Sequence, residues 1–238
     1  MQRAFGMLEV VLVFVLIGIL IAFAKPSASS QVYKTMHYLY ANLLYAKNLA
    51  LTQSTTYTTL PQTRWLSESF PSIHAPTLLS DPTLWQIQFH LSGEYTQSSF
   101  SIYLDTPRVA QTTNYDNRPM AGDIIAVSGI NMRCLSGYNN TNTADFCKNN
   151  TETSVRFLES YGVTLSVQAQ KSCKESQTSR IFFDYQGRPY CGKGKIPLSE
   201  RYVITFAKHK ARARLCILPH TGACLLYTSD AADECVNV

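Results

Sequence analysis

The most continuous apolar segment of the chain lies at its beginning. Phe5 to Ala24 is a run of 20 residues in which Glu9 carries the only charge. At about 1.5 Å of rise per residue, a helix of this length just crosses a hydrocarbon layer roughly 30 Å thick. The pattern predicts a membrane-spanning helix over residues 5–24, preceded by a short basic leader, residues 1–4. A carboxylate inside such a helix costs roughly 2.5–3.5 kcal/mol, so we expect Glu9 to have a functional partner.

A second, amphipathic pattern follows over residues 25–54. Apolar side chains recur at intervals of three and four residues: Val32, Met36, Leu39, Leu43, Ala46 and Ala50. This spacing predicts one apolar seam along a helix that packs on the protein's own sheet rather than in a coiled coil, because the seam is shorter than three heptads. Pro26 is expected to kink the helix. Residues 5–54 together predict one N-terminal helix, which from Phe5 to about Gln53 would be roughly 73 Å long.

From Ser54 onward, short runs of β-branched and aromatic residues alternate with turn residues. The expected strands are Leu84–Leu91, Phe100–Leu104, Ile124–Ser128, Val155–Leu158, Val163–Val167, Ile181–Tyr185 and Tyr202–Phe206. The predicted fold class is therefore α+β, with a long N-terminal transmembrane and amphipathic helix packed on a β-rich antiparallel globular head, residues 55–223.

The end of the chain has a different origin in our interpretation. The run from Cys224 to Glu234 matches the translation of a transposon-type sequencing-library adapter, so we expect residues 224–238 not to be native and the natural chain to continue past Gly222. Without them the acidic residues fall from 16 to 13 against 21 basic ones, and the net charge rises from +5 to +8.

The N-terminal motif resembles that of the prepilin family. A basic leader and a small residue precede Phe5 in Arg3-Ala4-Phe5-Gly-Met-Leu-Glu9. Glu9 is the fifth residue when Phe5 is counted as the first. The resemblance implies that a prepilin peptidase cuts between Ala4 and Phe5 and methylates the new amine of Phe5. Glu9 would answer the positive N-terminus of a neighbouring subunit or its own during assembly. Ala4 departs from the family, which usually has Gly there.

Two later motifs extend the resemblance. The segments 181–189 and 217–222 are similar to the paired C-terminal strand motifs of H-type minor pseudopilins and type IV pilus minor pilins. The implied function is that of a minor structural subunit of a type IV pilus or type II secretion pseudopilus. Its partners would be other pilin subunits and the inner-membrane assembly platform. Its location would be the bacterial inner membrane, single-pass with the head in the periplasm, and then the filament.

Two other interpretations of the apolar segment stay open. Ala22-Phe-Ala24 fits a signal peptidase site, which would release a soluble secreted binding protein. A plain single-pass anchor is the other. Neither accounts for Glu9 at its position.

The cysteines favour disulfides in an oxidising compartment. None stands in a C-x-x-C pair, which argues against a zinc site, and five remain when the tail is set aside. We expect Cys134 to pair with Cys147. The pairing among Cys173, Cys191 and Cys216 stays open, with one of the three free or joined to the missing tail.

A basic row near the end of the head is a candidate DNA contact. In an extended strand, Lys208, Lys210, Arg212 and Arg214 would lie on one face about 6.6 Å apart, which suits successive phosphates. An edge strand protected by charge is the alternative. We expect no enzyme, cofactor or metal, because the five histidines are scattered and Gly192-Lys-Gly194-Lys is a basic turn, not a phosphate loop.

Overall fold

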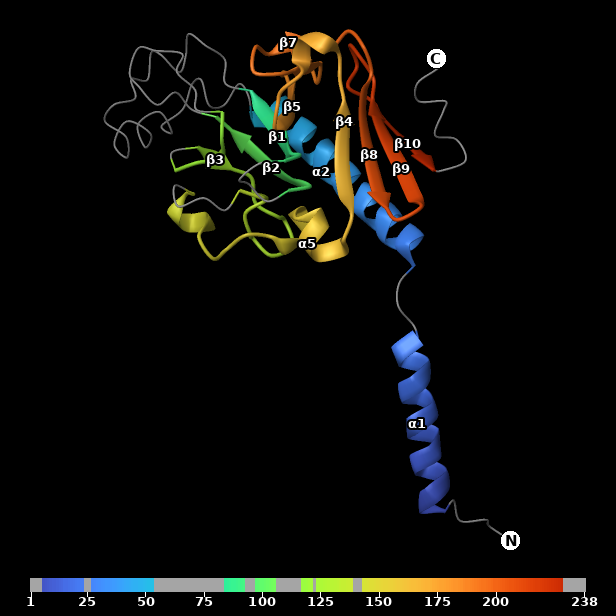
Figure 1. Cartoon of the computed structure of the whole chain (residues 1–238). Coiled ribbons are helices and arrows are strands. Elements are labelled where there is room, and N and C mark those ends of the chain that lie inside the picture. Colours follow the sequence, from blue (N-terminus) through green and yellow to red (C-terminus); the bar gives the residue numbers. More distant parts are fainter. Residues whose placement is uncertain are drawn as a thin grey trace.

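The computed structural model describes residues 6–23, 27–53, 84–92, 97–105, 117–121, 123–138 and 143–228. Figure 1 shows a head of two β-sheets beside helix α2, with helix α1 projecting from it. Ala4, Phe5 and Pro26 lie outside the described residues.

The long N-terminal helix expected over residues 5–54 is absent, and that part of the predicted fold class was wrong. The chain instead forms α1 (Met7–Phe23, 17 residues) and α2 (Ala28–Gln53, 26 residues). Among the described residues, neither helix combines the length and the apolar character needed to cross a membrane. The sequence places Pro26 between the two helices, and proline removes a helical N–H and disfavours helix in the residue before it.

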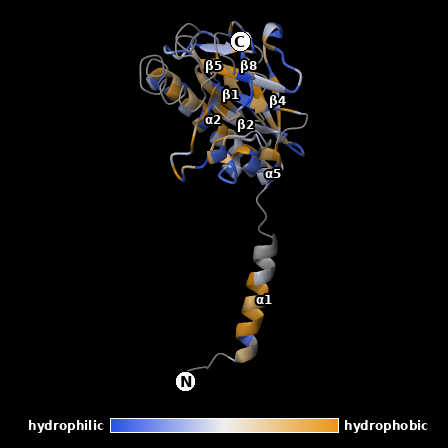
Figure 2. Ribbon diagram, turned by 90° about the vertical axis from the view of Figure 1, so that its left-hand side faces the viewer, coloured by the Kyte–Doolittle hydropathy of each residue, from blue (hydrophilic) through white to orange (hydrophobic). Residues whose placement is uncertain are grey.

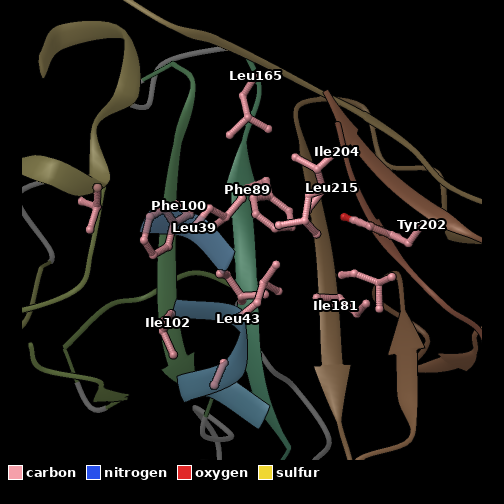
Figure 3. Packing of buried hydrophobic residues seen from close by; sticks show 14 of the residues in the cluster. Leu39, Leu43, Phe89, Phe100, Ile102, Leu165, Ile181, Tyr202, Ile204 and Leu215 are labelled. Atoms are coloured by element: carbon pink, nitrogen blue, oxygen red, sulfur yellow. The ribbon is translucent and has the colours of Figure 1, made fainter. Parts of the chain in front are cut away.

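Helix α2 packs its apolar seam into the head. All six seam residues are at most 1% exposed: Val32, Met36, Leu39, Leu43, Ala46 and Ala50. They contact strands of both sheets, and Figure 3 shows Leu39 and Leu43 among side chains from the two sheets. Three-and-four spacing thus gave the correct buried face of this helix.

The larger sheet has six antiparallel strands in the order β3-β2-β1-β5-β6-β7. Their bounds are β1 Trp85–His90, β2 Ser99–Leu104, β3 Ile124–Ile125, β5 Thr178–Phe183, β6 Pro189–Cys191 and β7 Ile196–Pro197. Every residue of β1 and β2 is buried. In β1, Ile87 and Phe89 join the hydrophobic core, while Gln88 and His90 point to the opposite face because strand side chains alternate.

The smaller sheet has four antiparallel strands in the order β10-β9-β8-β4. They are β4 Thr164–Gln168, β8 Tyr202–Lys208, β9 Ala211–Ile217 and β10 Cys224–Thr228. The core-facing side chains of β9 are Ala213, Leu215 and Ile217, each fully buried. The β-rich antiparallel head is therefore as expected, although it is built as two sheets.

Two local predictions need correction. Val155–Leu158 is not a strand: a 3₁₀ helix, η2 (Thr153–Val155), is followed by the short helix α5 (Phe157–Tyr161). Gly162 ends α5 at φ +63°, a left-handed conformation that suits glycine. The strands β6, β7, β9 and β10 were not among those expected. β10 is formed by residues 224–228, which the sequence pattern assigned to a non-native tail. That origin stays a prediction. Residues 229–238 lie outside the described part.

Candidate functional site

Glu9 lies in the first turn of α1 and is exposed. Its Oε2 accepts a hydrogen bond from the backbone N–H of Gly6 at 3.1 Å, and its own N–H donates to the Gly6 carbonyl at 2.9 Å. A carboxylate here satisfies a free backbone donor and faces the positive end of the helix dipole. Glu9 is thus directed toward the start of α1, which in sequence follows the predicted cleavage site between Ala4 and Phe5 by two residues.

The rest of α1 is an exposed apolar surface. Met7 is 87% exposed and Phe14 is 68% exposed. The other described side chains of α1 are exposed as well. In Figure 2 the coloured part of α1 is mostly orange, the hydrophobic end of the scale, and the helix stands away from the head. An apolar surface of this kind marks a contact with other protein or with lipid.

The two late motifs meet at the C-terminal part of α2. The Lys47 ammonium donates to the carbonyls of Thr221 at 2.8 Å and Gly222 at 3.3 Å. Gly187 and Gly222 both have positive φ, +74° and +60°, and a Cβ on Gly222 would stand 2.8 Å from the Gly187 carbonyl oxygen. Segments 181–189 and 217–222 therefore form one three-way junction between both sheets and α2, and their first role is structural.

The cysteines staple two parts of the head. Cys134 pairs with Cys147, as the sequence favoured, and Cys173 pairs with Cys191. Cys216 is disulfide-bonded as well, so none of the last three is free. Cys224 has a free thiol, and burial raises its pKa to about 11.

The basic row is not a row in the structure. The β8–β9 hairpin turns at His209, whose φ is +53°, so Lys208 ends one strand and Arg212 and Arg214 lie on the next. Lys208 points toward α2 and α5, donating to Gln31 Oε1 and to the Tyr161 carbonyl. The expected single face of four bases was wrong, because a tight turn reverses the chain between Lys208 and Arg212.

A buried polar network on β1 and β5 was not predicted from the sequence, in which the five histidines are scattered and form no catalytic or metal-binding pattern. His90 is 1% exposed and its Nε2 lies 3.0 Å from Ser101 Oγ. Arg180, 1% exposed, donates from Nε and Nη2 to the two carboxylate oxygens of Glu175, each at 2.8 Å. The available signal was the alternation in Trp85–His90, which places Gln88 and His90 on one face.

The described residues contain no group of three His, Cys, Asp or Glu side chains placed to hold a metal ion. Compared with family models, curated proteins and solved structures, the chain matches none of them.

Proposed function

We propose that this chain is a minor structural subunit of a pilin-type filament, either a type IV pilus or a type II secretion pseudopilus. The observation that carries the proposal is α1: an apolar helix whose described side chains are exposed, with Glu9 in its first turn beside a prepilin-like cleavage motif. In a filament, α1 packs against the same helix of other subunits.

Packing α1 against other copies removes its apolar side chains from water, at roughly 25 cal/mol for each Å² buried. The same packing desolvates Glu9, and a buried carboxylate needs a positive partner. Cleavage before Phe5 would create an amine close to Gly6, whose N–H already bonds the Glu9 carboxylate. The new amine of the same or a neighbouring subunit would then neutralise Glu9.

The head supports an exported location for this subunit. The disulfides Cys134–Cys147 and Cys173–Cys191 persist in oxidising compartments such as the periplasm or the cell exterior. We place the head there, both before and after its incorporation into the filament.

Glu9→Gln tests the proposal in the native host. We expect the variant to be processed at Phe5 but to be missing from sheared filaments, because the amide cannot neutralise an amine. Glu200→Gln is the matched control, since Glu200 is exposed on the head and its side chain makes no interaction among the described residues. Incorporation of Glu9→Gln at the level of the control would contradict the proposal.

N-terminal sequencing of the mature chain distinguishes a pilin-type subunit from a secreted binding protein. N-methylated Phe5 supports a pilin-type subunit, whereas a terminus at Lys25 supports a secreted binding protein. An abundance equal to that of the main filament protein would overturn the assignment as a minor subunit.

A further inference from the structure

A polar pocket of about 380 Å³ lies on the larger sheet, on the face turned away from α2. Gln88 and His90 of β1 form its floor, opposite Arg180 and Thr178 of β5 in register. The segment 172–177 and the β6–β7 turn, residues 192–194, form its walls. None of the described residues that line it is aliphatic, which favours a hydrophilic ligand over an apolar one.

The floor is fixed before any ligand arrives. Arg180 has its donors engaged by both Glu175 oxygens and by Asn117 Oδ1 at 3.0 Å. Gln88 Oε1 accepts from the Tyr103 hydroxyl at 2.9 Å, and Gln88 Nε2 donates to the Asn117 carbonyl at 3.1 Å. Such a network gives a pre-organised polar surface, which lowers the cost of ordering on binding.

A disulfide holds the two walls together. Cys173 precedes Lys174 on one wall, and Cys191 precedes the Gly192 turn on the other, and these two cysteines are bonded. Gly192 has φ +69°, and a Cβ there would stand 3.0 Å from Cys173 Cα. This close approach fixes the turn that carries Lys193 beside the segment that carries Lys174.

Basic side chains, among them two exposed lysines, give the pocket a positive charge. Lys174 and Lys193 are exposed and line it, and neither side chain forms an ion pair or hydrogen bond with any described residue. Arg118, Lys174, Arg180 and Lys193 against Glu175 give the lining a net charge of +3, four minus one. His90 adds no charge at neutral pH, because burial lowers its pKa to about 3. A positive, concave surface concentrates anions.

We propose that this pocket binds an acidic sugar, a hydroxylated ring that carries one carboxylate or phosphate. Lys174 and Lys193 hold the anionic group, and the side chains of Ser176 and Gln177 face the ring hydroxyls. The volume exceeds that of a bare inorganic anion and suits a single sugar ring. The proposal does not rest on the filament function.

Calorimetric titration of the full chain in mild detergent tests this site. We expect methyl glucuronide to bind at least tenfold more tightly than the neutral methyl glucoside. Its affinity should fall as salt is added. Lys174→Gln and Lys193→Gln should each weaken glucuronide binding about tenfold, the effect of losing one charged hydrogen bond. Lys171→Gln is the control, since Lys171 is an exposed neighbour that does not line the pocket.

The outcomes separate the ligand's sources and the rival explanations. Tighter binding of a galacturonic acid trimer than of the monomer supports the proposal with an acidic polysaccharide as the source, and equal binding supports it with a free sugar. Equal affinity for glucoside and glucuronide overturns it. So does a Lys171→Gln effect as large as the other two, or displacement of the glucuronide by an equal concentration of inorganic phosphate, which would leave an unspecific anion site.

Discussion

The buried pair of Glu175 and Arg180 offers a sharp test of how the head is stabilised. Their side chains are 6% and 1% exposed, and two hydrogen bonds of 2.8 Å join them. Glu175→Gln keeps the shape of the side chain but removes its charge. Burial lowers the pKa of Arg180, but Tyr103 and Glu175 outweigh that effect and raise it. We expect the guanidinium to stay charged in the variant, because arginine keeps its proton in proteins, and to lose its hydrogen-bonded counter-charge.

The size of the loss follows from that uncompensated charge. Breaking a buried ion pair by removing one partner costs about 3–5 kcal/mol. For a domain of this size, about 2–4 °C of Tm accompanies each kcal/mol, so Tm should fall by about 6–20 °C. Arg180→Met in the same chain removes the stranded charge, and the double variant should be more stable than Glu175→Gln alone.

Thermal and urea unfolding of the native chain, Glu175→Gln, Arg180→Met and the double variant completes a double-mutant cycle. We expect a coupling energy of about 1–3 kcal/mol between the two positions. Glu200→Gln, on the exposed surface, should change stability by less than about 0.5 kcal/mol. A loss below about 1 kcal/mol for Glu175→Gln, or additive effects of the two changes, would refute the role of the pair.

Three further predictions concern other parts of the head. Burial, followed by the Arg180 charge, lowers the pKa of His90 to about 3 in the folded head. In the unfolded chain this histidine becomes protonated near pH 6.5. The free energy of unfolding should therefore fall as pH drops below about 6.5, by at most about 1.4 kcal/mol per pH unit. Urea unfolding of His90→Gln between pH 6.5 and 5 should show a flatter loss, and an unchanged slope would contradict this assignment. Gly222→Ala should lower the free energy of unfolding by about 1–3 kcal/mol because of the positive φ and the nearby Gly187 oxygen. Gly129→Ala is the control and should cost little, since a Cβ there meets open space. Equal losses for the two variants would argue against the structural role of the junction. Replacing both Cys134 and Cys147 by Ser opens a loop with a sequence separation of 13 and should lower the unfolding free energy by about 3 kcal/mol, which a urea midpoint equal to that of the native chain would disprove.

The sequence determined the features that depend on local pattern. Helical spacing from Val32 to Ala50 identified the buried face of α2, because residues three and four apart share one side of a helix. Alternation and turn residues located β1, β2, β4 and β8 within a few residues. The short separation of Cys134 and Cys147 likewise indicated their pairing.

Other features were not determined by the pattern of charged and apolar residues. The basic residues from Lys208 to Arg214 fit one extended strand in isolation, but pairing of β8 with β9 requires a turn between them. The helix over residues 5–54 was expected from the apolar run and the amphipathic seam, and helical patterns on both sides of Pro26 say little about whether the backbone continues as one helix.

The polar pocket and its supporting pair were decided by tertiary structure alone. Gln88, Glu175 and Lys193 are far apart in sequence and individually common in solvated strands and turns. They come together because β1 pairs with β5, and because the Cys173–Cys191 disulfide brings the β6–β7 turn against the segment before β5. Burial then fixes their chemistry, since a guanidinium removed from water requires Glu175 as its counter-charge.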